Sequence, residues 1–253
     1  MKLGRIRLFA GILCLALPAV AQPSADRTFS RLNTFTAFAE YSNDSSHIIL
    51  GTTENRKIGA LGFQYQRRLV HRPLLDLSYT AEIRPAMLES DPDETETNIE
   101  TLPISSTSSL DVGAVGRCNA GVYPYSFTFT SPLGPPETFA GKTVISCSRR
   151  TVVEQGFSPA GIRINLLPRH RLQPTFSTFG GYMFSTQEVP VPTAGSFNYT
   201  FEFGAGLELF RAHSSARSVR LEYQVQHFSN KNTANANPGV DSGFVKLTYA
   251  FGR

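Results

Sequence analysis

Strict alternation of apolar and polar side chains near the C-terminus constrains this fold more than any other feature of the sequence. Successive side chains point to opposite faces of a β-strand, so Leu221, Tyr223 and Val225 would share one face of a strand. The intervening positions carry charged or amide side chains: Arg220, Glu222, Gln224 and Gln226. A second alternating run, residues 241–251, follows a polar loop. The end of the chain is therefore predicted to be a hairpin of two strands.

Similar alternation recurs along the chain and gives about eight strands. The predicted strands are residues 30–41, 57–68, 75–84, 162–166, 176–184, 199–209, 220–230 and 241–251. The connections between them alternate between long (42–55, 89–150, 185–196, 230–241) and short (69–73, 168–171, 211–217). An all-β, eight-stranded antiparallel transmembrane β-barrel with short periplasmic turns and long external loops has this pattern. A soluble eight-stranded barrel or sandwich remains the alternative, and the alternation of loop lengths favours the membrane.

The first residues have the three parts of a secretory signal peptide. Lys2, Arg5 and Arg7 precede an apolar run, residues 8–17, and Ala19-Val20-Ala21 is a small-residue cleavage site. We expect a signal peptide at residues 1–21 and a mature barrel at residues 22–253. Beyond the signal, the sequence has no run of about 18 apolar residues that could span a membrane as a helix.

The polar faces of the predicted strands carry charges of both signs. In a small barrel these side chains would pair in a filled lumen, so no pore is expected. The residues concerned are Glu82, Glu202, Glu208, Glu222, Arg84, Arg163 and Lys246. The formal net charge is only +4, and no basic cluster is interleaved with aromatic residues, which argues against a nucleic-acid partner.

Residues 89–150 lack clear periodicity and are too long for an ordinary connection. They are expected to form a functional loop or a partly ordered insertion, with a short hairpin possible around residues 123–129. Cys118 and Cys147 fall in this segment and could form a disulfide in an oxidising compartment. A metal site is the weaker alternative, because neither cysteine has a second cysteine or a histidine nearby.

The C-terminal hairpin carries a candidate catalytic group at its external end. If His227 faces Asp241, apolar residues face apolar residues along the rest of the hairpin. Opposite residues lie about 5 Å apart at Cβ, so hydrogen bonds among Ser229, His227 and Asp241 are possible. These are the residue types of a nucleophile, a general base and the acid that orients it. The alternative is that the trio only caps the lipid-facing band at the polar headgroups.

The same stretch resembles the C-terminal signature of the outer-membrane lipid A 3-O-deacylase (PagL) family, which includes an His-Phe-Ser-Asn run and an Asn-Pro-Gly loop. Residues 227–230 and 237–239 match these two motifs. The resemblance implies Ser229 as nucleophile, His227 as base and Asn230 as oxyanion-hole donor. The usual acid of the family is Glu, and this chain has Asp241 at that place.

The resemblance implies a serine carboxylic-ester hydrolase of the cell outer membrane, a lipid A deacylase or related acyloxyacyl hydrolase. Its partner would be lipid A of lipopolysaccharide in the outer leaflet, and no cofactor is required. The acyl chain could lie along the apolar residues Val225, Tyr223, Val245 and Leu247. The same trio could instead cleave a phospholipid ester. The alternative from another class is a non-catalytic barrel whose 89–150 segment binds a partner or shields the surface.

Overall fold

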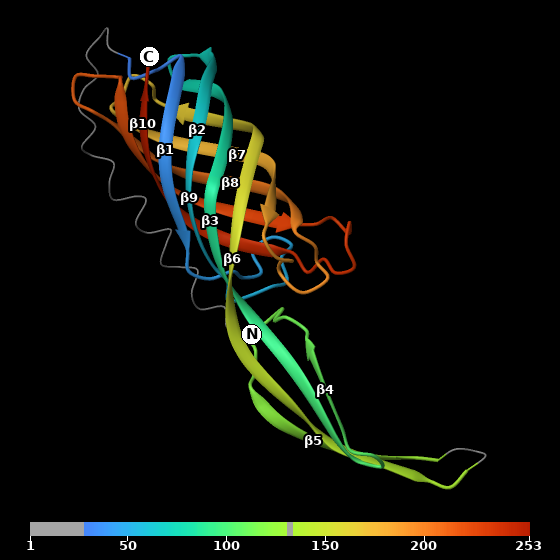
Figure 1. Ribbon diagram of the computed structural model, residues 1–253. Helices are drawn as coiled ribbons and strands as arrows, with labels where there is room; N and C mark the ends of the chain where they lie inside the picture. The colour runs from blue at the N-terminus through green and yellow to red at the C-terminus, as the bar shows by residue number, and fades with distance from the viewer. Residues whose placement is uncertain (1–27, 131–133) are drawn as a thin grey trace.

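The computed structural model describes residues 28–130 and 134–253, and over these residues it contains ten β-strands and no helix (Figure 1). The expected signal peptide, residues 1–21, lies outside the described residues. A membrane-spanning helix is accordingly not found among the described residues. The strands are β1 (Asn33–Ser42), β2 (Lys57–His71), β3 (Leu75–Leu102), β4 (Ser106–Asp111), β5 (Gly121–Phe129), β6 (Glu137–Leu166), β7 (Leu172–Ser185), β8 (Phe197–Phe210), β9 (Arg217–Ser229) and β10 (Val240–Gly252).

Within the described residues, eight of the strands close into an antiparallel ring. The order around it is β1, β2, β3, β6, β7, β8, β9 and β10, and the pairing of β10 with β1 completes the circle. These are the eight strands expected from the alternation. The remaining two strands, β4 and β5, lie at the outer edges of β3 and β6.

The two ends of the ring differ in the connections that they carry. One end, called here the turn end, holds both chain termini of the described part and the short connections 72–74, 167–171 and 211–216. The other end, called the loop end, holds the connections 43–56, 186–196 and 230–239. The strands β3 and β6 continue beyond the ring at the loop end (Figure 1).

The interior of the ring is filled with buried charged side chains. Lys246 Nζ lies 2.6 Å from Glu82 Oε2, and Arg163 Nη1 donates to Glu222 Oε1 at 2.6 Å. Arg84 binds Glu202 through two parallel hydrogen bonds of 2.8 and 2.5 Å. These pairs join strands that are not neighbours in the ring, so they cross the lumen. The expected pairing of charges in a filled lumen is confirmed.

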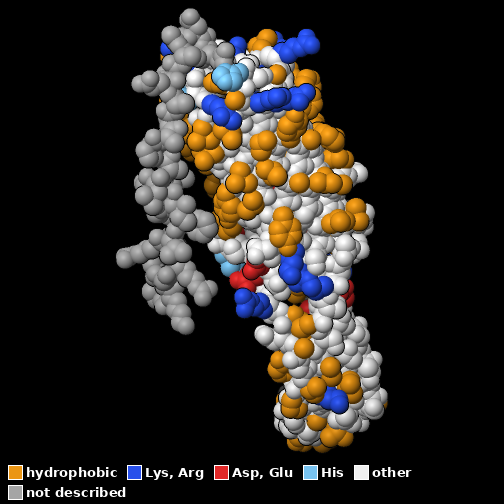
Figure 2. Space-filling model, turned by 90° about the vertical axis from the view of Figure 1, so that its left-hand side faces the viewer, with side chains coloured by type: hydrophobic (Ala, Val, Ile, Leu, Met, Phe, Trp, Pro, Cys, Tyr) orange, Lys and Arg blue, Asp and Glu red, His pale blue; other side chains and the backbone are white. Residues whose placement is uncertain are grey.

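The outer wall is apolar, which inverts the polarity of a water-soluble barrel. Along β9 and β10, Leu221, Tyr223, Val245 and Leu247 are each more than half exposed, while the residues between them are buried. Figure 2 shows hydrophobic side chains spread over the visible barrel wall, with Lys and Arg gathered near its two ends. A polar interior behind an apolar wall is the arrangement that a barrel needs in lipid.

The structure corrects the expectation of a long loop at 89–150 but confirms the hairpin expected around residues 123–129, which β5 forms with the outer part of β6. Most of this segment is regular β-structure: the outer parts of β3 and β6 pair with each other and carry β4 and β5 at their edges. We call residues 91–150 the β-extension. Its side chains are mostly exposed or half-buried, so no continuous buried face requires apolar residues at every second position. The alternation that reveals a half-buried strand is consequently missing.

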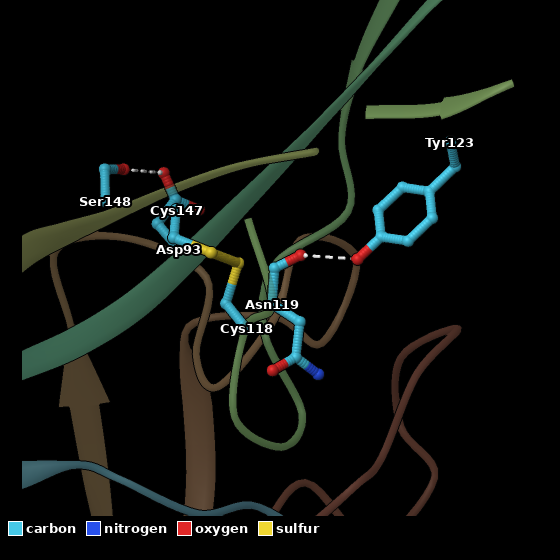
Figure 3. The surroundings of a disulfide bond; sticks show 6 residues. All are labelled: Asp93, Cys118, Asn119, Tyr123, Cys147 and Ser148. Carbon is cyan, nitrogen blue, oxygen red and sulfur yellow. Dashed lines mark hydrogen bonds between the residues drawn. A yellow bond between two sulfur atoms is a disulfide. The ribbon is translucent and has the colours of Figure 1, made fainter. Parts of the chain in front are cut away.

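The predicted disulfide between Cys118 and Cys147 is confirmed, with the two Cα atoms 5.8 Å apart. It ties the connection between β4 and β5 to strand β6. Figure 3 shows the bond beside Asp93 of β3, at the root of the β-extension.

Candidate active site

His227 and Asp241 meet on the outer wall at the loop end. They are opposite each other in the β9–β10 register, as the sequence predicts, and Val225 is opposite Gly243. The His227 Nδ1–H donates to Asp241 Oδ1 at 2.6 Å. The His227 side chain is 15% exposed and that of Asp241 is fully buried. This arrangement fixes the imidazole ring and its tautomer, with Nε2 as the nitrogen left to act as a base.

Three backbone amides hold the other oxygen of the Asp241 carboxylate. They belong to the β1–β2 loop, residues 43–56, which covers Asp241 from outside. The Ile48 and Leu50 amides donate to Oδ2 at 3.0 Å each, and the Ile49 amide donates to the same oxygen. Charge-assisted bonds of this kind are stronger than neutral ones, so Asp241 is held ionised and in one orientation.

Gly51 permits this close approach. A Cβ at this position would lie 2.4 Å from the backbone nitrogen of Asp241 and 2.8 Å from its Cγ. The hydrogen bonds from the β1–β2 loop to Asp241 were not predicted from the sequence, because backbone amides have no residue-specific signature.

Ser229 lies on the same outer face as His227, two residues further along β9 and opposite Tyr199 of β8. Its side chain is half-buried. Among the described residues, none makes a hydrogen bond with the Ser229 hydroxyl or with His227 Nε2. The structure therefore joins Asp241 of β10 to His227 of β9 and places Ser229 on β9 beside His227, without a hydrogen bond between Ser229 and His227.

Asn230 is buried and organises the loop that follows β9. Its Nδ2 donates to the carbonyl oxygens of Ala194 and Ala236, and its Oδ1 accepts from the Asn232 amide at 2.9 Å. Its own backbone amide donates to Asn237 Oδ1 at 3.0 Å. Both hydrogens of the side-chain Nδ2 are therefore engaged in this structure. The expected oxyanion-hole role requires that Nδ2 release the carbonyl of Ala194 or that of Ala236.

The Asn-Pro-Gly motif connects this loop to the β1–β2 loop. The Thr52 amide donates to Pro238 O at 2.9 Å, and the Thr53 hydroxyl donates to Gly239 O at 2.9 Å. Gly239 has a positive φ of 59° and lies against the His227 ring. The motif thus joins the two loops that surround the His–Asp pair.

An open groove of about 430 Å³ lies on the outer wall beside the pair. It runs between the β1–β2 loop and strands β9 and β10. The lining residues are Tyr41, Asn43, Asp44, Ser46, Ile48, Tyr223, Gly243 and Val245. The groove is apolar on the strands and polar along the loop, which suits an amphiphile lying across the boundary of a bilayer.

No group of three or more His, Cys, Asp or Glu in the described residues could hold a metal ion.

The fold and the site define an antiparallel β-barrel of inverted polarity with a fixed His–Asp pair on its outer wall. Residues 153–250 match the family model described as lipid A 3-O-deacylase (PagL), which confirms the resemblance noted in the sequence. The match runs from the ring part of β6 to β10 and contains His227, Ser229, Asn230 and Asp241. The β-extension, the β1–β2 loop and strands β1 to β3 lie outside it.

Comparison with curated protein sequences found no match. Among solved structures, the chain is similar to Neisserial surface protein A, with a TM-score of 0.44, 9% identity and coverage of 87% of this chain and 97% of that one. It is also similar to the β-domain of the Bordetella autotransporter BrkA, with a TM-score of 0.26, 11% identity and coverage of 87% and 98%.

Proposed function

We propose that this protein is an outer-membrane esterase that removes a fatty-acyl chain from lipid A. The observation that carries the proposal is the His227–Asp241 pair, which is oriented on the lipid-facing wall with Ser229 beside it. The match of residues 153–250 to the lipid A 3-O-deacylase model supports the choice of substrate. In this proposal residues 1–21 are the signal peptide, residues 22–253 form the mature barrel, and the loop end faces outward.

The chemistry is acyl transfer to Ser229 followed by hydrolysis. His227 Nε2 takes the hydroxyl proton as Ser229 Oγ attacks the ester carbonyl. The proton then passes to the leaving alkoxide, which departs as an alcohol and leaves an acyl-enzyme. A water molecule, deprotonated by the same nitrogen, attacks the acyl-enzyme and releases the fatty acid. Asp241 stays ionised and stabilises the imidazolium that forms in each half of the reaction.

Asn230 is proposed as the oxyanion donor, as the family resemblance implies. In the structure its Nδ2 donates to Ala194 O and Ala236 O. Substrate binding would exchange one of these carbonyls for the developing oxyanion, which attracts the donor more strongly because it is charged.

The groove beside the pair is the proposed site of the acyl chain. Tyr223 and Val245, two of the four residues expected from the sequence, line it, and Ile48 adds a wall from the β1–β2 loop. Val225 is buried and does not line the groove. The acyl chain would remain against apolar side chains while the ester reaches the polar rim. No part of the acyl chain then has to leave the hydrocarbon phase of the bilayer.

Mass spectrometry of lipid A extracted from cells tests this proposal. Cells that express the wild-type protein should lose one acyl chain from lipid A, and cells that express Ser229→Ala should not. Ser126→Ala, at an exposed position on β5, is the matched control and should behave as wild type. Identical spectra for wild type and Ser229→Ala would contradict the proposal.

A non-catalytic role is the second candidate, and the β-extension favours it. Phe127 and Phe129 of β5 are each more than half exposed there, and the Phe127 ring stacks on that of Phe139 in β6. Exposed apolar side chains in a group indicate an interaction surface. This role predicts intact lipid A in every sample, so the same experiment separates the two.

A further inference from the structure

Arg56, at the end of the β1–β2 loop, is fully buried and connects four segments of the loop end. Its guanidinium donates to Glu54 O at 3.0 Å, to Ala114 O at 2.8 Å and to Pro190 O at 2.9 Å. Its Nε lies 2.9 Å from Asp91 Oδ1. The β1–β2 loop, the β4–β5 connection, the β7–β8 loop and β3 therefore meet on one side chain.

The loop that Arg56 anchors is the one that holds Asp241. The Arg56 amide donates to Ser45 Oγ at 3.1 Å, and the Ser46 amide donates to Asp241 O at 3.0 Å. The amides of residues 48–50 then bind the Asp241 carboxylate. The loop is thus fixed at Arg56 on one side and closes over the candidate catalytic acid on the other.

The disulfide holds the segment that supplies one of the carbonyls bound by Arg56. Ala114 O accepts from Arg56, and Val115 O accepts from the Glu54 amide at 2.9 Å. Three residues after Val115, Cys118 is bonded to Cys147 of β6 (Figure 3). On its other side the segment is confined by the β7–β8 loop, because a Cβ on Gly113 would lie 2.5 Å from Pro192.

We propose that Arg56 is a positioning residue for Asp241, and that the Cys118–Cys147 disulfide keeps the β4–β5 connection in place for Arg56. The β-extension then acts on the reaction from outside the ring, through the β1–β2 loop. This inference deepens the proposed esterase function and rests on it for its effect on catalysis. Its structural part, the ordering of residues 48–50, stands without the activity.

Two altered proteins test the inference in detergent micelles. Arg56→Lys keeps a positive charge beside Asp91, but an ammonium group lacks the planar set of N–H donors with which the guanidinium binds three carbonyl oxygens. The double variant Cys118→Ser/Cys147→Ser leaves Arg56 intact and frees the β4–β5 connection. Arg117→Lys is the control, an exposed arginine in the same connection.

The first readout is amide hydrogen exchange at Ile48, Ile49 and Leu50. Both altered proteins should exchange these amides about tenfold faster than wild type or more, because the loop opens locally. Amides of β9 and β10 within the ring should exchange as in wild type, which shows that the barrel is folded. Unchanged exchange at residues 48–50 in the folded double variant would overturn the inference, whether or not the protein cleaves lipid A.

The second readout is the separation of kcat from KM on a short-chain ester. A displaced Asp241 should lower kcat by about 100-fold in Arg56→Lys, with less effect on KM, because misplacement of a catalytic group by about 1 Å has that cost. Faster exchange with an unchanged kcat would overturn the positioning role. An inactive wild type would refute the proposed function instead, and the exchange result would still decide the structural part.

Discussion

Asp241 stands where the family resemblance implies a glutamate, whose side chain is one methylene longer. It lies directly opposite His227 in the β9–β10 register, so its carboxylate reaches Nδ1 at 2.6 Å without the extra methylene. The amides of the β1–β2 loop hold the other oxygen of this carboxylate, Oδ2. The Asp241 carboxylate is therefore placed by the register and kept in place by the loop.

Replacing Asp241 by Asn should abolish most of the activity and leave the barrel folded. An amide cannot stabilise the imidazolium, and it favours the wrong histidine tautomer, which costs a factor of about 10³ or more in kcat. The measurement is the rate of ester hydrolysis by purified protein. Folding is checked by the mobility of unheated protein on a denaturing gel. A variant with more than about a tenth of wild-type activity would contradict the role assigned to Asp241.

Gly243 leaves space for the phenol of Tyr223, which lies across it in the groove. A Cβ at this position would be 2.1 Å from Tyr223 Oη. Gly243→Ala should push this flexible ring into the groove and lower kcat/KM for long-chain esters by about tenfold, with less effect on short ones. A series of esters of increasing chain length measures this. Gly116→Ala is the control, because an added Cβ there meets nothing within 4 Å, and an equal loss for all chain lengths would refute the assignment of the groove.

The β1–β2 loop completes the surroundings of the His227–Asp241 pair on strands β9 and β10. The loop pairs with residues 238–242. The Thr52 amide donates to Pro238 O, and Ser45 forms an isolated β-bridge with Ser242. The loop also forms one side of the groove. The strands alone would place His227 and Asp241 together, but they would leave the carboxylate without its three amide donors.

Gly51→Ala should disrupt this element selectively. The new Cβ would collide with the backbone of Asp241, at 2.4 Å from its nitrogen, and the loop must move away. We expect a loss of about 100-fold in kcat, with unchanged stability of the ring. Hydrolysis rate and urea unfolding, measured on the same preparation, check both parts. Full activity in this variant would show that the loop is not required.

The sequence was sufficient for the elements in which one face meets lipid and the other a packed lumen. The register of β9 and β10 followed from matching apolar with apolar residues, and it brought His227 opposite Asp241 as expected. The β-extension gave no such signal, because its strands have no continuous buried face. The β1–β2 loop could not be predicted either, since its contribution comes from backbone amides and from the space left by Gly51.

At the scale of the whole molecule, the lumen is a network of buried charges. Their burial is stable only because each charge is paired with one of opposite sign. Lys246 Nζ is fully buried, 2.6 Å from Glu82, 3.5 Å from Glu40 and 3.7 Å from the centre of the Phe38 ring. The sequence identified most of the charged members, but the Glu40 contact and the choice of partners depend on the closure of the ring.

Lys246→Met should destabilise the barrel, because it leaves the carboxylates of Glu82 and Glu40 without this partner. Removal of one member of a buried ion pair costs about 3–5 kcal/mol. Equilibrium urea unfolding in micelles or vesicles measures the change. Lys142→Met, on the exposed β-extension, is the control and should change stability by less than about 0.5 kcal/mol. A similarly small change for Lys246→Met would contradict the network as described.

The most direct test of the central claim is to trap the nucleophile with an alkyl phosphonate ester that mimics the tetrahedral intermediate. The account predicts a covalent adduct on Ser229, located by mass spectrometry of peptides. It also predicts that the adduct is lost in His227→Ala and strongly reduced in Asp241→Asn, while both variants remain folded. An adduct on another residue, or labelling of Ser229 that does not depend on His227, would contradict it.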